Sequence, residues 1–358
     1  MNEKLLFWVG EQPSPVKKDR SSDLVMDSVI NYYDSEQRKP TYQWGQLFLD
    51  NGAFTARMSG VSLDKERVIE VQESIDPDRT IPLDYPFTVG QTSKQMKKSW
   101  VKTRENILYW QTSTGLRKKL VPALHAWNKD SLSGNIRWLQ RNADSDFLAL
   151  GSIVGSSFGR FRGFFGDRQP SIELIDMLAL AISSISKLSD FKVHLMGFGS
   201  SPLTLHLGYY LGAQSTDSAG YRRKAAFGKI VLPGKGERHV GDDSMTGRDF
   251  GKNAMSIREG NPRREEDLEM LNRCACPVCS TNADMLWVDW KARAIHNEFV
   301  MKEEANIAHR FLNLGQSTYE KYLDRVVYSG SSLRYLWEYA KLRKKYFRIS
   351  DAMLEAGV

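Results

Sequence analysis

The chain alternates short apolar runs with longer amphipathic stretches, and this pattern restricts its fold more than any other feature. Short apolar runs are typical of buried strands, whereas stretches such as Gln95–Trp110, Ile172–Leu188 and Pro202–Leu211 are typical of helices. Strands that alternate with helices form parallel sheets, so the pattern predicts an α/β fold. The short runs are Leu5–Val9, Gln46–Leu49, Thr80–Leu83, Leu120–Leu124, Phe147–Leu150, Lys192–Met196 and Ala213–Thr216.

Seven such strand–helix units by residue 216 suit a closed barrel better than most open sheets. We therefore predict a (β/α)8 TIM barrel whose last strand lies further along the chain. A doubly wound sheet is the alternative. The barrel is expected in residues 1–265. Residues 266–358 are expected to hold a zinc-binding insertion and C-terminal helices, which run from about Asn297 to Phe347 and close the barrel.

Nearly every predicted strand ends in a polar residue or a glycine. Asp50, Asp84 and Asp217 end three of them, and His125 ends a fourth. A single aspartate in such a place is more often a helix N-cap. In a barrel of parallel strands, however, all these ends converge on the face that carries active sites. The other strand ends run into Gly151 and Ser152, and into Gly197 and Gly199.

Carboxylates that face one substrate suggest the chemistry of a glycosidic bond. One carboxylate attacks the anomeric carbon and the other transfers a proton to the leaving group. A further carboxylate can accept the adjacent N1–H and 2-amino donors of guanine. The residues alone do not divide these roles among the three aspartates.

Three cysteines within six residues predict a metal site. Cys274, Cys276 and Cys279 are followed by His296, and three thiolates with one imidazole form the closed tetrahedral set of a structural zinc. Such clustering favours metal ligation in a reducing compartment over a disulfide framework. We therefore expect one structural Zn²⁺.

The charge of the chain is mildly basic, with a net charge of +7 and a pI of about 9.1. Two stretches of the chain are rich in lysine and arginine. Arg222–Arg264 has 11 Lys/Arg against 5 Asp/Glu, and Lys341–Arg348 closes the chain. Both stretches can attract phosphates, although solvated basic faces explain them equally well.

The segment Gly155–Arg168 interleaves phenylalanines with arginines, a mixture that suits stacking on bases and contact with phosphates. It predicts a lid over nucleic acid. An ordinary long loop packed on the barrel is the alternative.

No apolar run approaches the roughly 20 residues that a membrane span needs. Met1–Gly10 is interpreted as a first strand rather than a signal peptide, so a cytoplasmic location and no membrane partner are expected.

Taken together, these motifs resemble the tRNA-guanine transglycosylase family over most of the chain. Leu49–Phe54 (LDNGAF) resembles the segment that carries the family's general acid/base, which implies that role for Asp50. Asp84 in PLDYPF falls at the guanine-binding aspartate. His194–Pro202 (HLMGFGSSP) is the closest match, and Asp217 follows it at the distance of the catalytic nucleophile.

The same resemblance implies further site residues. It places a base pocket at Leu148–Gly155 (LALGSIVG) and basic contacts after the nucleophile, and it repeats the type and order of the zinc ligands with a shorter interval to His296. The substrate-binding residues implied in this way are Asp84, His125, Gly151, Ser152, Ile153, Gly197, Gly199, Arg222 and Arg223.

Departures from the family pattern favour a particular branch of it. His125 stands where the family has a base-reading glutamine, Ser152 replaces a pocket glycine, and no additional RNA-binding domain is expected at the C-terminus. These changes are the pattern expected of a paralogue. One paralogue group inserts 7-deazaguanine bases into DNA, often in viruses and mobile elements, and we predict that this chain is similar to that group.

The implied partners are therefore DNA and a free 7-deazaguanine base of the preQ0 type, with no nucleotide cofactor. A tRNA enzyme and a zinc-braced binding barrel without catalysis are the alternatives. A homodimer and a virus-encoded enzyme acting in a host cytoplasm are both compatible with the sequence.

Overall fold

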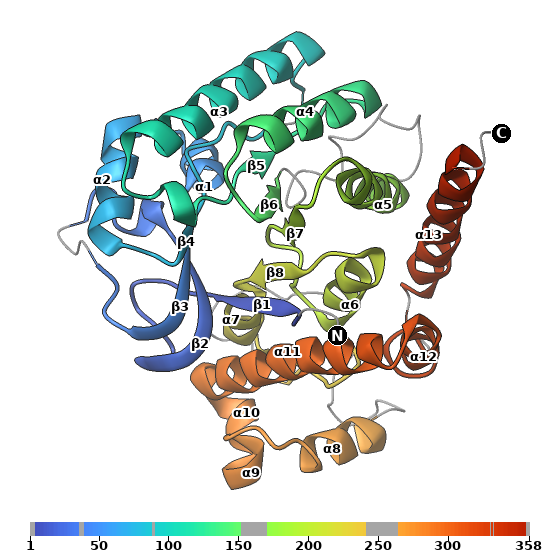
Figure 1. Ribbon diagram of the computed structural model, residues 1–358. Coiled ribbons are helices and arrows are strands. Elements are labelled where there is room, and N and C mark those ends of the chain that lie inside the picture. Colours follow the sequence, from blue (N-terminus) through green and yellow to red (C-terminus); the bar gives the residue numbers. More distant parts are fainter. Residues whose placement is uncertain are drawn as a thin grey trace.

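Eight parallel strands form the centre of the molecule (Figure 1). The structure is a computed structural model, and it describes residues 4–35, 39–87, 90–151, 170–240, 264–329, 331 and 333–355. The strands are hydrogen-bonded in the order β4-β3-β2-β1-β8-β7-β6-β5. Their bounds are β1 (Leu6–Gly10), β2 (Asp19–Ser28), β3 (Gln43–Asp50), β4 (Arg79–Thr80), β5 (Ala123–Leu124), β6 (Phe147–Leu150), β7 (Lys192–Leu195) and β8 (Ser215–Ser218).

The two ends of this strand order meet and close the ring. Thr80 at the end of β4 forms a parallel bridge with Leu120, just before β5. The amide of Val121 donates to the carbonyl oxygen of Thr80 at 2.8 Å. The predicted (β/α)8 barrel is confirmed by this arrangement.

The position of the eighth strand differs from the prediction. It does not lie further along the chain but is β2, between β1 and β3, and the ring is complete at Ser218. The first half of β2 is polar, and its sequence DRSSDLVMDS shows no long apolar run. Its parallel pairing with β3 nevertheless runs from Asp19 to Ser28. Tertiary pairing therefore makes a strand where the local pattern did not indicate one.

Helices follow six of the strands and surround the barrel (Figure 1). Several begin with a capping box, in which a side chain at the helix start accepts an N–H of the first turn. Thr92, Asn128 and Ser201 play this part, so the strand-to-helix turns at this end of the barrel are well defined. The helices are α1 (Ala53–Met58), α2 (Lys65–Ile75), α3 (Ser93–Ser113), α4 (Lys129–Asn142), α5 (Pro170–Leu188), α6 (Pro202–Leu211) and α7 (Gly220–Ala226).

The barrel interior is a packed core that contains a few polar side chains. Successive strand residues point to opposite sides, so Trp8 and Phe48 face inward with ring centroids 5.4 Å apart, while Phe7 packs in the outer cluster against helices. On β8 the inward side chain of Ser215 accepts a hydrogen bond from the Trp8 indole at 2.9 Å. The interior thus holds hydrogen-bonded polar groups beneath the end of β8.

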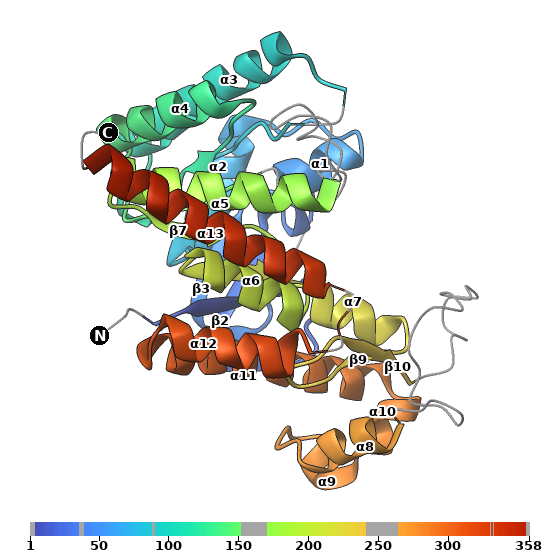
Figure 2. The same cartoon turned by 90° about the vertical axis from the view of Figure 1, so that its right-hand side faces the viewer.

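The C-terminal part adds a hairpin and helices along one flank of the barrel (Figure 2). Helix α11 contacts β1, α6 and α7, and α13 packs against α5. Among the described residues, no helix is long and apolar enough to cross a membrane. These elements are β9 (Lys229–Val231), β10 (Glu237–His239), α8 (Arg264–Asn272), α9 (Cys279–Asn282), α10 (Met285–Val288), α11 (Trp290–Asn313), α12 (Gln316–Tyr322) and α13 (Arg334–Glu355).

A buried ionic cluster joins helix α11 to the start of β2. The Arg20 guanidinium contacts both carboxylate oxygens of Glu298 at 3.1 Å and pairs with Asp23 at 3.0 Å and with Glu11. Lys302 pairs with Glu298 at 3.0 Å. Because Arg20 and Glu298 are almost fully buried, this cluster links the C-terminal helices to the strands.

Candidate active site and metal centre

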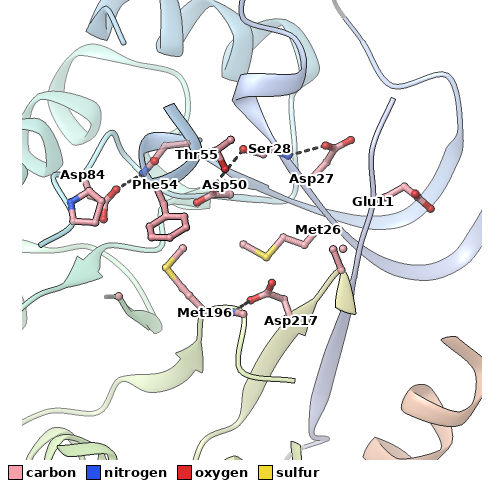
Figure 3. A pocket seen from close by; sticks show the side chains of 16 residues that line it. Glu11, Met26, Asp27, Ser28, Asp50, Phe54, Thr55, Asp84, Met196 and Asp217 are labelled. Atoms are coloured by element: carbon pink, nitrogen blue, oxygen red, sulfur yellow. Dashed lines mark hydrogen bonds between the residues drawn. The ribbon is translucent and has the colours of Figure 1, made fainter. Parts of the chain in front are cut away.

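A pocket of about 300 Å³ opens at the carboxyl ends of the strands (Figure 3). Three aspartates, Asp50, Asp84 and Asp217, line it together with Gly151 and Gly197. The barrel therefore brings these five sequence-predicted residues to one cavity. The remaining lining residues are Gly10, Glu11, Met26, Asp27, Ser28, Asn51, Phe54, Thr55, Pro86, Met196 and Ala219.

Asp50 is the last residue of β3, and its surroundings favour the protonated carboxyl. Its Oδ2 accepts the Gly52 amide at 2.9 Å and the Ser28 hydroxyl at 3.2 Å. Burial, followed by the negative charge of Asp84, raises the pKa of Asp50 to about 7, although the two hydrogen bonds oppose the rise. A carboxyl with this pKa both donates and accepts a proton near neutral pH.

The turn that holds Asp50 depends on a glycine. Gly52 has a φ of 78°, in the left-handed region that favours glycine. A Cβ at this position would also lie 2.9 Å from the Cβ of Ile30. The Asn-Gly pair after Asp50 therefore provides the sharp turn whose amide reaches the carboxylate.

Asp84 is buried at the rim and held by two neighbours. Its Oδ1 accepts the side-chain amide of Asn51 at 3.0 Å, and its Oδ2 lies 2.6 Å from His125 Nε2. His125 is 1% exposed and does not line the pocket. A Cβ on Gly151 would lie 2.6 Å from the His125 ring. His125 thus contacts the base-binding candidate Asp84 and requires a glycine at position 151.

Asp217 lies within β8 rather than after it, and faces the pocket from the opposite side. Its Oδ1 accepts the Gly197 amide at 2.6 Å (Figure 3). Gly197 has a φ of 65°, so glycine suits this turn after β7. Gly199 donates to the Asp217 carbonyl at 3.1 Å and does not line the pocket. A Cβ there would lie 2.8 Å from the Phe7 ring, so Gly199 allows close packing behind the site.

Apolar side chains occupy the space between the aspartates. Figure 3 shows the Phe54 ring and the thioethers of Met26 and Met196 gathered between them. Phe54 is 40% exposed at the pocket. Such a lining suits a flat aromatic ligand, whose faces pack on apolar groups while its edge reaches the carboxylates.

The three cysteines and His296 also come together, as the sequence predicts. Their ligand atoms all lie within 4.8 Å of one another. The distances from His296 Nδ1 to the sulfurs of Cys274, Cys276 and Cys279 are 3.7, 3.4 and 3.4 Å. A tetrahedral zinc with bonds of about 2.3 Å to sulfur and about 2.0 Å to nitrogen separates these atoms by roughly 3.6 Å.

The surroundings of His296 suit metal ligation. Its Nε2 lies 2.9 Å from the carbonyl oxygen of Val231, which places the ring proton on Nε2 and leaves the Nδ1 lone pair facing the sulfurs. The donor set and its spacing therefore fit a structural metal ion that ties α11 to the α8–α9 segment.

Comparison with known proteins agrees with this geometry. The family model of queuine tRNA-ribosyltransferases matches residues 46–316, well over half of the chain. The chain belongs to this family. The matched range includes the three aspartates and the four candidate metal ligands, and membership indicates that the protein is a transglycosylase. The curated proteins that were searched contain no match.

Two predicted basic contacts of the transglycosylase have different surroundings. Arg222 donates to the Glu11 carboxylate at 2.6 Å and to the Ser14 carbonyl at 2.7 Å, so it is engaged beside β1. Arg223 is exposed to solvent. Ser152, Ile153, the segment Gly155–Arg168 and residues 241–263 of the basic stretch lie outside the described residues.

The C-terminal basic stretch of the transglycosylase contributes to packing. Lys341 pairs with Asp324 at 3.0 Å, and Arg343 pairs with the buried Asp176 on α5. These two cations of Lys341–Arg348 therefore attach α13 to the rest of the chain, and both interpretations of the stretch, as a phosphate contact or as a solvated basic face, stay predictions.

Sequence reasoning assigned no role to three polar residues near the site. Glu11 and Asp27 line the pocket, and His194 lies beneath Asp217. Asp27 accepts the hydroxyls of Tyr32 and Tyr42 at 2.5 Å each. Because β2 was not predicted as a strand, the sequence did not indicate that Asp27 lies at the pocket. His194 lay in a recognised motif, but only the register of β7 and β8 reveals its contacts.

Proposed function

We propose that this transglycosylase exchanges a guanine in DNA for a free 7-deazaguanine base through a covalent intermediate on Asp217. The observation that carries the proposal is the placement of Asp50 and Asp217 around one apolar pocket. Asp50 has a pKa of about 7, and Asp217 is held by a backbone amide. One carboxyl thus suits proton transfer, and the other suits attack on carbon.

In the first half of the proposed reaction, guanine leaves. The target base must come out of the stack because its C1′ is not accessible in a duplex. Asp84 accepts the N1–H and 2-amino donors, and the apolar side chains around Phe54 and Met196 pack on the ring. Asp217 attacks C1′, the C1′–N9 bond breaks, and protonated Asp50 gives its proton to the departing base.

In the second half, the 7-deazaguanine enters the vacated pocket. Asp50 accepts the N9 proton of the incoming base, whose N9 then attacks C1′. The bond between C1′ and Asp217 breaks, and its electron pair returns to the carboxylate. Two displacements retain the anomeric configuration, and the protons balance without a nucleotide cofactor.

The choice of DNA over tRNA rests on changes around the pocket. His125 contacts Asp84 instead of facing the cavity, whereas both reacting aspartates remain. A change of sugar alters contacts beside the reacting carbon, because the 2′-hydroxyl distinguishes RNA from DNA. The family's tRNA substrate is the alternative. The raised pKa of Asp50 argues against a binding barrel without catalysis.

The proposed function assigns supporting roles to the rest of the chain. Residues 1–265 carry the reaction, and residues 266–358 brace the barrel through a structural Zn²⁺ held by Cys274, Cys276, Cys279 and His296. Closely spaced thiols suit a reducing cytoplasm. Arg222 and Arg223 lie beyond the nucleophile, where Arg223 is free to contact phosphate.

The test is incorporation of a labelled base. Purified protein is incubated with labelled 7-deazaguanine and either genomic DNA or bulk tRNA at one salt concentration. Label in DNA but not in the Asp217→Asn control supports the proposal. Label in tRNA alone overturns the DNA assignment, and incorporation by Asp217→Asn overturns the nucleophile.

A further inference from the structure

A chain of buried polar groups runs beneath Asp217 to the barrel interior. The Trp8 indole N–H donates to Ser215 Oγ at 2.9 Å, and Ser215 Oγ lies 2.8 Å from His194 Nδ1. His194 Nε2 is in turn 3.2 Å from Asp217 Oδ1. The strand register brings these residues together, because His194 pairs with Ser215 between β7 and β8, and Trp8 pairs with Asp217 between β1 and β8.

The hydrogen bonds of Ser215 favour the tautomer of His194 whose proton is on Nε2. An indole N–H only donates, so Ser215 Oγ accepts from Trp8. The hydroxyl proton of Ser215 then has His194 Nδ1 as the acceptor that faces it. A neutral imidazole whose Nδ1 accepts carries its proton on Nε2, the nitrogen that lies 3.2 Å from Asp217 Oδ1.

His194 is fully buried, and its ring packs against Phe48 with centroids 4.9 Å apart. Within the described residues, Nε2 is not aligned for a hydrogen bond, although Asp217 Oδ1 is only 3.2 Å away. A buried N–H without an aligned partner is costly and uncommon in a folded protein. A small movement of the Asp217 carboxylate supplies that partner.

We infer that His194 is a positioning residue that, with the Gly197 amide, holds Asp217 Oδ1 so that Oδ2 faces the reacting sugar. Oδ1 already accepts the Gly197 amide at 2.6 Å. No donor to Oδ2 is found in the described part of the chain, so Oδ2 is the oxygen that attacks C1′. This inference rests on the proposed function, in which Asp217 is the nucleophile.

The two donors to Asp217 Oδ1, His194 and the Gly197 amide, act differently on the two half-reactions. In the covalent intermediate Oδ2 is bonded to C1′, and Oδ1 is the carbonyl oxygen of a neutral ester. When the incoming base displaces Asp217, the C1′–Oδ2 bond breaks and the negative charge returns to the carboxylate. Donors at Oδ1 stabilise that charge, so His194 favours breakdown of the intermediate over its accumulation.

The decisive experiment measures turnover together with the covalent intermediate. His194→Leu is assayed with the polymer that takes up the labelled base, and acid-quenched samples are analysed by intact-protein mass spectrometry. We expect kcat to fall roughly ten- to a hundred-fold, as for loss of a hydrogen bond to a charged group. The share of enzyme present as the covalent adduct should rise, while KM for the base changes little.

Two further variants separate positioning from packing. His194→Gln places an N–H donor near the position of Nε2 and should recover most of kcat. Ser215→Ala keeps the His194 ring but frees its tautomer, and should give an intermediate loss with the same rise in adduct. His206→Leu is the matched control: it removes another buried histidine, bonded to Glu304 at 2.7 Å, and should lower stability without changing the adduct share.

The outcomes distinguish this inference from the proposed function. If Asp217→Asn exchanges bases normally, the proposed function fails and the role of His194 fails with it. If Asp217→Asn is inactive but folded His194→Leu keeps the wild-type kcat and adduct share, only the inference about His194 is overturned. A His194→Gln variant as impaired as His194→Leu also overturns it, because packing alone would then explain the loss.

Discussion

The Asp50→Asn substitution should inactivate the transglycosylase and at the same time stabilise its fold. In the folded protein the pKa of Asp50 rises from 3.8 to about 7, first because of burial and then because of Asp84. That difference corresponds to roughly 4 kcal/mol of unfavourable free energy once the group ionises. Because the side chain keeps some contact with solvent in the pocket, we expect about half of this, near 2 kcal/mol.

The stabilisation by Asp50→Asn depends on pH. A carboxyl whose folded pKa is raised costs nothing below its unfolded pKa, because it is protonated in both states. The cost grows as the pH rises from about 4 through 7 and is complete above that range. Asparagine keeps the shape and an acceptor oxygen for the Gly52 amide but carries no charge. The stabilisation by Asp50→Asn should therefore be near zero at pH 4 and largest at pH 8.

Urea unfolding midpoints of the wild type and Asp50→Asn at pH 5, 6.5 and 8 measure this directly. The difference between the two proteins is compared at each pH, so the titration of groups that do not interact with Asp50 cancels. Asp78→Asn is a control carboxylate outside the pocket that accepts the Leu47 amide at 2.7 Å. If Asp50→Asn is no more stable than the wild type at pH 8, the argument from a buried, destabilised carboxyl is refuted.

Three other substitutions test separate parts of the structure. Glu298→Ala removes one carboxylate partner of the buried Arg20 and should lower the free energy of unfolding in urea by about 3–5 kcal/mol. The control Glu303→Ala, on the same helix, should change the free energy of unfolding by less than about 1 kcal/mol. We expect elemental analysis to find about one zinc per chain in the wild type and none in Cys276→Ser. Cys276→Ser should lower the thermal midpoint more than it alters kcat per folded molecule. A wild type without bound zinc would contradict this prediction. Gly151→Ala brings a methyl group within 2.6 Å of the His125 ring and should raise KM for the base about tenfold or more. An unchanged KM would show that the His125 ring moves freely.

The sequence predicted the barrel and the convergence of its aspartates because both depend on local pattern. Asp50 and Asp217 stand at or near strand ends, and parallel strands bring such ends to one face whatever the details of packing. The prediction of a last strand further along the chain was wrong. The first half of β2 is polar, with no apolar residue from Asp19 to Asp23, and only its pairing with β3 makes it a strand.

Other parts of the site depend on register and side-chain contacts, which a single sequence does not reveal. His125 is a polar residue after a strand, but whether it faces the pocket or contacts Asp84 depends on how its ring lies against Gly151. The contact between His194 and Asp217 likewise requires the exact pairing of β7 with β8. The roles of Ser152 and Ile153 stay predictions.

The pairing of β1 with β8 has a consequence for how the protein is made. Strand β1, with Trp8 opposite Asp217, has no partner on one side until β8, which ends at Ser218, has been synthesised. Its outward residues Phe7 and Val9 share a core with Ala294 and Met301 of α11, which emerges from the ribosome later still. The apolar strand β1 of the nascent chain therefore remains uncovered until β8 and α11 have been synthesised. Pairing of strands that lie far apart in the sequence slows folding, and an apolar strand that stays uncovered during synthesis is a site where chaperones can assist.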